Sequence, residues 1–114
     1  MSELSQKKCT PCSKGATPMK GAILSTWMQL LPEGWHVIEE HHLEKEYRFK
    51  NFQQALEFTC AIGAVAEAEG HHPTITLSWG GVKVSIWTHK INGLTENDFI
   101  LAAKCDQLAK NSPG

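Results

Sequence analysis

Apolar and polar residues alternate most clearly between positions 74 and 88. Alternation is typical of a half-buried strand, because successive side chains point to opposite faces of a sheet. Gly80-Gly81 interrupts the alternation, and this pair is favoured in the two-residue turns of hairpins. The apolar positions on either side of it are Ile75, Leu77, Trp79, Val82, Val84 and Ile86. The segment therefore predicts an antiparallel hairpin in which Trp79 lies opposite Val82.

Apolar residues recur at helical spacing in three other segments. The first covers 17–31, where Thr17 would cap the helix. The second follows Asn51, a good N-cap residue, and Gly70 would close it in a left-handed conformation. The apolar face expected for this helix comprises Phe52, Ala55, Leu56, Thr59, Ile62, Gly63 and Ala66. The third follows Thr95, another N-cap residue, so the pattern predicts three amphipathic helices.

Two further strands are predicted at 35–40 and 45–49, joined by a turn at 41–44. The predicted order is therefore helix, strand, strand, helix, strand, strand, helix. Strands that come in hairpins form antiparallel sheets, and helices cover the apolar face of such a sheet. We therefore predict an α+β fold, a four-stranded antiparallel sheet with three helices packed on one face.

The composition suits a single domain. The chain has 114 residues, of which 41% are hydrophobic and 20% charged. Residues 1–16 are polar and lack periodicity, so we expect a flexible N-terminal arm followed by one domain at 17–114. A net charge of −1 gives no general reason to bind nucleic acid, and no apolar run could span a membrane. Two of the four cysteines fall in predicted helices, which favours a reduced, cytoplasmic protein.

Three histidines converge if the predicted hairpin is continued beyond its strands. Counting outward from the glycine pair places His72 opposite His89, and directly opposed residues have Cβ atoms about 5 Å apart. His71 immediately precedes His72. Histidine titrates near neutral pH, so one imidazole can donate a proton while another accepts one. The spacing alone leaves two interpretations open, an acid–base cluster or three solvated histidines.

Metal binding is a third interpretation. Three histidines and a water form some catalytic zinc sites. Neighbours such as His71 and His72, however, point to opposite faces of a strand and would not both reach one ion. Cys9 and Cys12 form half of a metal-binding pattern, and one such pair cannot fill a tetrahedral site. We therefore expect no metal at the histidines and no resident cofactor, and leave open metal binding by the cysteines across subunits.

Around these histidines the sequence resembles the pterin-4a-carbinolamine dehydratase family. That family's motif is an acidic residue, three spacers, His, His or Asn, Pro, five spacers, an aromatic residue, nine spacers, His, and Asp after about eight more. The residues that fill it here are Glu67, His71, His72, Pro73, Trp79, His89 and Asp98. A match at every position is more specific than a lone short motif, and the similarity runs from about residue 17 to the C-terminus. The resemblance favours the functional interpretation of the histidines.

The resemblance implies an α+β domain that forms a homodimer or homotetramer. It implies dehydration of 4a-hydroxytetrahydropterin to quinonoid dihydropterin, which recycles the cofactor of aromatic amino acid hydroxylases. His71 and His89 would transfer protons near the 4a-hydroxyl group, and His72 would bind the pterin and support acid–base chemistry. The substrate-binding residues would be Trp35, Pro73, Glu67 and Asp98.

Several of these assignments have alternatives. Trp35 would form a wall or stacking surface for the flat pterin ring, or would be a core tryptophan. Glu67 precedes His71 by one helical turn and would orient it by a hydrogen bond. Asp98 would orient a histidine or simply cap the third helix. A different function class is a non-enzymatic binding module, since some relatives are dimerisation cofactors of a transcription factor or assembly factors. The complete set of histidines favours the enzyme.

Overall fold

The computed structural model describes residues 6–9 and 17–110 of the chain. Its strands form one antiparallel sheet in the order β1-β2-β4-β3. The elements are α2 (Gly21–Met28), β1 (His36–Ile38), β2 (His42–Arg48), α3 (Phe52–Glu69), β3 (Thr74–Ser78), β4 (Gly81–Ile86), the 3-10 helix η1 (His89–Ile91) and α4 (Glu96–Lys110). The predicted α+β fold and the order of its elements are confirmed, with η1 added before the last helix.

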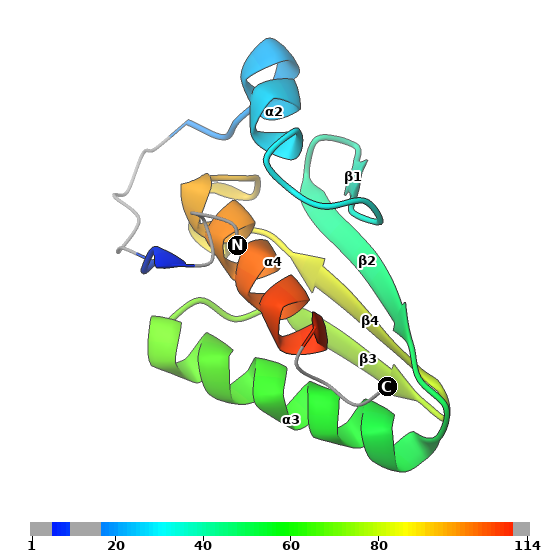
Figure 1. The fold of residues 1–114 in the computed structure, drawn as a ribbon. Helices are drawn as coiled ribbons and strands as arrows, with labels where there is room; N and C mark the ends of the chain where they lie inside the picture. The colour runs from blue at the N-terminus through cyan, green and yellow to red at the C-terminus, as the bar shows by residue number, and fades with distance from the viewer. Residues whose placement is uncertain (1–5, 10–16, 111–114) are drawn as a thin grey trace.

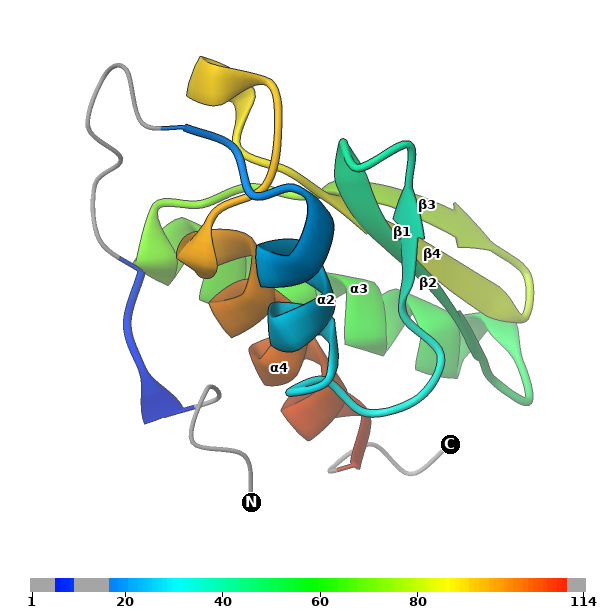
Figure 2. The same cartoon turned by 90° about the horizontal axis from the view of Figure 1, so that it is seen from above.

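The helices cover one face of the sheet (Figure 1). α3 and α4 lie side by side across this face, and α2 lies against α4 beside the β1–β2 hairpin (Figure 2). Trp27 of α2 packs on Phe99 of α4 with ring centroids 5.7 Å apart, which joins α2 to the core. None of the described helices is long and apolar enough to cross a membrane.

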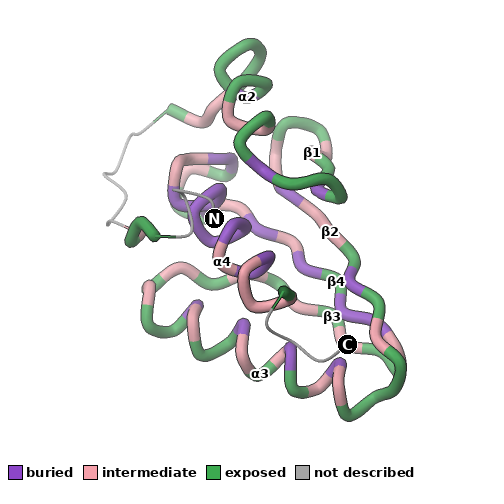
Figure 3. Tube along the Cα trace, in the orientation of Figure 1, coloured by how far each residue is buried: buried purple, intermediate pink, exposed green. Residues whose placement is uncertain are grey.

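The core lies between the sheet and the helices (Figure 3). Val82, Val84 and Ile86 of the central strand β4 are fully buried, as the alternation predicted. The first half of α4 is buried from Asn97 to Ala103, because it packs against the sheet, α3 and Trp27 of α2. This arrangement places the start of α4 inside the fold, next to the end of β4.

The β3–β4 hairpin turns one residue earlier than predicted. Ser78 pairs with Gly81, so Trp79 and Gly80 form the turn, and the predicted turn at Gly80-Gly81 was wrong. Gly81 belongs to the strand because it also pairs with Arg48 of β2. The register therefore differs from the predicted one by two residues. A shift of two keeps every side chain on its expected face, so the apolar face was still predicted correctly.

The β1–β2 hairpin also turns earlier than predicted. Ile38 lies opposite His42, so the predicted turn, which began at His41, was wrong. Glu39 and Glu40 form the turn with positive φ angles of 53° and 56°. The His41 amide donates to the Ile38 carbonyl over 2.8 Å and closes the turn. Two successive left-handed residues are typical of a type I′ turn, which glutamate rarely occupies, so no sequence signal marked this turn.

The first helix begins later than predicted. Thr17 was expected to cap it, but α2 begins at Gly21 and its N-cap residue is Lys20, whose side chain makes no capping hydrogen bond. The Met19 amide instead donates to the Leu94 carbonyl over 2.8 Å. Bonding to a distant loop therefore overrode the local signal for a helix start.

α3 begins and ends as predicted, but its buried face is rotated. Asn51 caps its start through its side chain, and Gly70 ends it with a φ of 66°. Phe52, expected on the buried face, is 43% exposed. Phe58 was missed and is buried against the ring of Tyr47, with centroids 4.7 Å apart. The buried residues of the helix are Ala55, Phe58, Ile62 and Ala66.

Candidate active site

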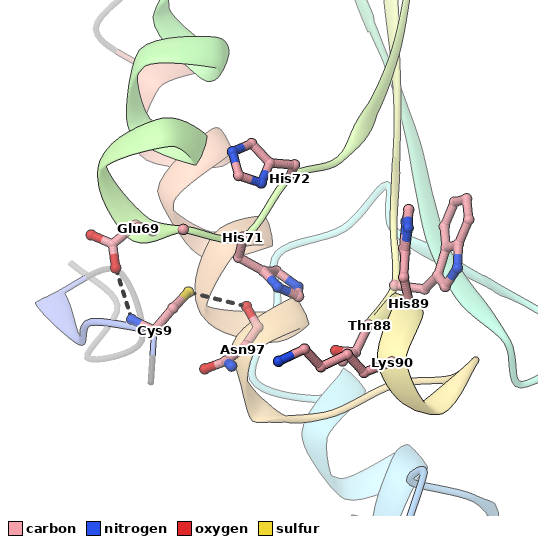
Figure 4. Close-up of a pocket in the computed structure, with 10 residues that line it drawn as sticks. Cys9, Glu69, His71, His72, Thr88, His89, Lys90 and Asn97 are labelled. Atoms are coloured by element: carbon pink, nitrogen blue, oxygen red, sulfur yellow. Dashed lines mark hydrogen bonds between the residues drawn. The ribbon is translucent and has the colours of Figure 1, made fainter. Parts of the chain in front are cut away.

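A pocket of about 420 Å³ lies at one end of the sheet. Its walls come from the end of α3 and the segment after it, the end of β4, η1 and the start of α4 (Figure 4). His71, His72 and His89 all line it. A cavity of this volume is suited to a small-molecule ligand.

The three histidines share this pocket for a different reason from the one predicted. The predicted register placed His72 directly opposite His89, but the ladder ends where Thr74 pairs with Ser85, before either histidine. His72 instead lies in the irregular segment that joins α3 to β3, and His89 begins η1. Figure 4 shows His71 directed toward the side of the pocket that carries His89. The convergence was predicted correctly, but its predicted cause was wrong.

A buried carboxylate orients His71. Its Nε2 lies 2.6 Å from Oδ1 of Asp98, and the two side chains are 11% and 0% exposed. A carboxylate only accepts, so Nε2 carries the hydrogen and donates it. Neutral His71 then has no hydrogen on Nδ1, and no residue in the described part of the chain bonds this second nitrogen. The arrangement leaves Nδ1 able to accept a proton.

Asp98 both bonds a histidine and caps a helix, the two roles that the sequence left open as alternatives. Besides bonding His71, it accepts the Thr88 hydroxyl and the Thr95 amide at Oδ2, each over 2.8 Å. Thr88 adjoins His89, and Thr95 immediately precedes α4. One carboxylate therefore caps the start of α4 and fixes the segments that carry two of the three histidines.

Glu67 orients a different histidine from the one predicted. It was expected to bond His71, but its Oε1 lies 2.8 Å from Nε2 of His72. Nε2 of His71 is instead bonded to Asp98 in the interior. The His72 and Glu67 side chains are 61% and 82% exposed, so this pair is weaker than the buried one. His72 therefore lies at the open edge of the pocket.

His89 is placed by an aromatic contact. Its exposed ring stacks on Trp87, with centroids 4.5 Å apart and planes at 22°. Trp87 also lines the pocket. The site thus combines one histidine bonded in the interior, one at the edge and one stacked on an indole.

The family is decided by sequence comparison. Residues 17–108 match the family model described as pterin 4 alpha carbinolamine dehydratase. The chain belongs to this family. A relative from Alkaliphilus metalliredigens (strain QYMF), provisionally named a pterin-4-alpha-carbinolamine dehydratase, is 51% identical over 107 residues, which are 94% of this chain and 96% of the relative. A relative with the same provisional name from Rubrobacter xylanophilus is 49% identical over 108 residues, which are 95% of this chain and 100% of the relative.

Two solved structures share the dehydratase fold. A transcriptional coactivator/pterin dehydratase from Brucella melitensis aligns with a TM-score of 0.76 and 26% identity, covering 82% of this chain and 99% of that one. A pterin dehydratase-like protein identified as a RuBisCO assembly factor in the alpha-carboxysome aligns with a TM-score of 0.59 and 25% identity, covering 68% of this chain and 90% of that one. The names of these relatives therefore span catalytic and non-catalytic roles.

All four residues predicted to bind substrate in this dehydratase-family chain lie outside the pocket lining, Glu67 among them. Trp35 is 6% exposed in the core, and its Nε1 donates to Oδ2 of Asp106 over 2.8 Å. Asp98 is fully buried and is linked to the pocket by its bond to His71. Pro73, which is half-buried, does not line the pocket either. Of the two alternatives for Trp35, the structure shows the core tryptophan.

Cys9 lines the pocket, although the sequence placed it in a flexible arm. Its amide donates to Oε1 of Glu69 over 2.7 Å, and its thiol lies 3.7 Å from the carbonyl of Asn97 (Figure 4). These contacts join positions far apart in the chain, and no local pattern signals them. Among residues 6–9 and 17–110, no three His, Cys, Asp or Glu side chains could hold a metal ion together. Cys12 lies outside the described residues.

A buried network around Asp106 suppresses ionisation of two neighbours. The carboxylate accepts the Tyr47 hydroxyl over 2.6 Å and the Lys45 ammonium group over 2.8 Å. Burial, reinforced by the Asp106 charge, raises the pKa of Tyr47 far above its ordinary value. Burial and Asp106 also raise the pKa of the Cys105 thiol to about 12, although Lys45 opposes the shift. The network lies in the interior, and its residues do not line the pocket.

Proposed function

We propose that this protein is a dehydratase that converts 4a-hydroxytetrahydropterin to quinonoid dihydropterin. The observation that carries the proposal is the meeting of His71, His72 and His89 in one pocket, with His71 bonded to a buried carboxylate. Membership of the pterin carbinolamine dehydratase family supports the same activity.

The reaction requires one proton to be given and one to be taken. The bond between C4a and its hydroxyl oxygen breaks, and the oxygen leaves as water after gaining a proton. N5 loses its hydrogen as a proton, and the electron pair of the broken N5–H bond forms the C4a–N5 double bond. Atoms and charge balance without an electron acceptor. Paired acid and base groups are therefore sufficient.

Their surroundings suggest separate roles for the histidines. His71 takes the N5 proton at Nδ1, because Asp98 keeps the hydrogen on Nε2 and stabilises the imidazolium that results. His89 donates a proton to the leaving hydroxyl, since its exposed ring can regain a proton from water. His72, oriented by Glu67 at the edge of the pocket, bonds a polar edge of the pterin.

The proposal has a cellular context. A 4a-hydroxypterin is what a pterin-dependent hydroxylation leaves behind, so an aromatic amino acid hydroxylase supplies the substrate and the dehydratase recycles its cofactor in the cytoplasm. The protein acts as a homodimer or homotetramer. Large apolar side chains at the surface, including Trp79 at 69% exposure and Phe52 at 43%, support self-association. Light scattering of the purified protein measures the subunit number.

A coupled assay tests the activity. A pterin-dependent hydroxylase generates the 4a-hydroxy intermediate, and its decay is followed by absorbance with and without this protein. The wild type should accelerate the decay, and His71→Ala, His72→Ala and His89→Ala should each remove most of the acceleration. His36→Ala is the matched control, because His36 is exposed on β1 and lies outside the pocket. Absence of acceleration by the folded wild type would refute the proposal.

A non-enzymatic binding role is the second candidate function. It is favoured by the names of two structural relatives, one a transcriptional coactivator and one an assembly factor. The exposed Trp79 offers an apolar contact for a partner. The two roles are distinguished by Trp79→Ser, which should weaken a partner complex and leave the rate of dehydration unchanged.

A further inference from the structure

His89 is the least constrained of the three pocket histidines. His71 and His72 each bond a carboxylate, whereas the side chain of His89 has no hydrogen bond or ion pair to any described residue. Its ring contact is the stack on Trp87. The position of the His89 imidazole therefore depends on Trp87 and on the backbone of η1.

His41, at the end of the β1–β2 turn, contacts both of these supports. Its ring centroid lies 5.2 Å from that of Trp87. Its Nε2 lies 2.8 Å from Oδ1 of Asn92, the residue that ends η1. Asn92 adopts a left-handed conformation, with a φ of 52°, and its amide lies 3.3 Å from the carbonyl of His89. The His41 side chain thus contacts both Trp87, on which the His89 ring stacks, and Asn92, which ends the η1 turn that carries His89.

The hydrogen bonds of a neutral His41 ring place its hydrogen on Nε2. An amide oxygen only accepts, so Nε2 of His41 donates to Asn92. Nδ1 of the neutral ring then accepts from Nδ1 of His42, which lies 3.0 Å away. The His42 ring also packs near Trp87, with centroids 5.8 Å apart. The two histidines therefore form an ordered chain of hydrogen bonds that ends on η1.

The backbone just before His41 adopts a strained conformation. Glu39 and Glu40 both have positive φ angles, which non-glycine residues seldom adopt. Glu40 is fixed further because its Oε2 accepts the amide of Gly21 over 2.9 Å. Strained backbone persists where surrounding contacts hold it, and it is concentrated near functional sites. This turn brings His41 onto Trp87 and Asn92.

We infer that His41 is a positioning residue for His89, acting through Trp87 and Asn92 and raising the rate of the dehydration. The inference rests on the proposed function. His41 does not line the pocket, so it acts on the reaction through other residues. It also lies outside the family motif that the chain matches, so the motif would not reveal this role.

Steady-state kinetics give the first test. His41→Ala should lower kcat about 10-fold and change KM by less than about 2-fold, because misplacing a reacting group affects the chemical step more than substrate binding. His41→Gln should recover part of the loss, since its amide can donate to Asn92. His36→Ala, an exposed histidine on the adjoining strand, should match the wild type. If His41→Ala raises KM alone, or leaves kcat unchanged, the inference is overturned.

A double-mutant cycle separates positioning from general stability. In a His89→Ala background, adding His41→Ala should cause no further loss of rate, because the residue being positioned is absent. A purely structural contribution by His41 would lower the rate by the same factor in both backgrounds. That additive result would overturn the inference.

A spectroscopic readout keeps the inference separate from the activity itself. Protons of the His89 ring are shifted by the indole ring current of Trp87 when the two rings stack. His41→Ala should move these NMR resonances toward those of an exposed histidine, and His36→Ala should leave them in place. If the wild type does not dehydrate pterins, the proposed function fails, but the shift still reports the position of His89. Unmoved resonances in His41→Ala overturn the positioning role.

Discussion

Asp98→Asn tests the logic of the site most directly, because it preserves shape and removes only the charge and one acceptor. Oδ2 of Asp98 accepts two donors, the Thr88 hydroxyl and the Thr95 amide. After substitution, the amide oxygen must remain there, so the amide nitrogen faces His71. Two N–H groups cannot bond each other, so His71 gives up the hydrogen on Nε2 and carries it on Nδ1. The base at Nδ1 is then lost.

The expected size of the effect follows from these contacts. A positioned general base contributes about 100-fold or more to the rate, so kcat should fall about 100-fold. Stability should fall less, by about 1–2 kcal/mol, because charged hydrogen bonds become neutral ones while a buried charge is also removed. Asp98→Ala, in contrast, removes a carboxylate that is 0% exposed and accepts from Thr88, Thr95 and His71, and should destabilise the fold by about 3–5 kcal/mol.

The coupled dehydration assay measures kcat, and urea unfolding followed by tryptophan fluorescence measures stability. Glu67→Gln is the matched control, because it makes the same chemical change in the exposed pair with His72, and kcat should stay within about 2-fold. The reasoning is refuted if folded Asp98→Asn keeps kcat within about 3-fold of wild type. It is also refuted if the two substitutions lower kcat equally.

Three other predictions concern stability and metals. The free energy of unfolding should decrease as pH rises above 9.0, where an unfolded thiol ionises while folded Cys105 remains protonated up to about 12. Cys105→Ala should reduce that slope in urea titrations between about pH 9 and 10, below the range where unfolded Tyr47, with its ordinary pKa of 10.0, adds the same effect, and an unchanged slope contradicts the assignment. Trp35→Phe should cost about 1–3 kcal/mol in urea unfolding by removing the donor to Asp106, with KM unchanged; a raised KM would instead restore Trp35 to the substrate site. Prolonged dialysis against EDTA should leave dehydration unchanged, and a loss that zinc reverses would favour a metal mechanism.

Local signals predicted the elements well, because residues close in sequence satisfy them. Asn51 bonds an amide three residues ahead, and Gly70 adopts the left-handed conformation that ends its own helix. Apolar and polar residues alternate along β4, and this pattern is satisfied by any sheet with one buried face. The family motif likewise depends on spacing within one stretch of chain, so it identified the catalytic candidates.

Turns and boundaries were predicted less well where a distant segment competes for the backbone. Gly81 had a strong turn signal, yet pairing with Arg48 placed it in a strand. Thr17 had a good cap signal, but a hydrogen bond from Met19 to Leu94 delayed the helix. Hydrogen bonds between distant segments are comparable in energy to local preferences, so local reasoning cannot rank the two.

By itself, the sequence determined the α+β fold, the alternation of its strands and the identity of the three histidines, since each follows from periodicity or spacing. The tertiary structure alone decided which group each histidine contacts: Asp98 for His71, Glu67 for His72 and Trp87 for His89. These pairings depend on how helix ends and strand ends meet in space. Burial then makes one pair strong and leaves another exposed, and burial is a property of the packed molecule.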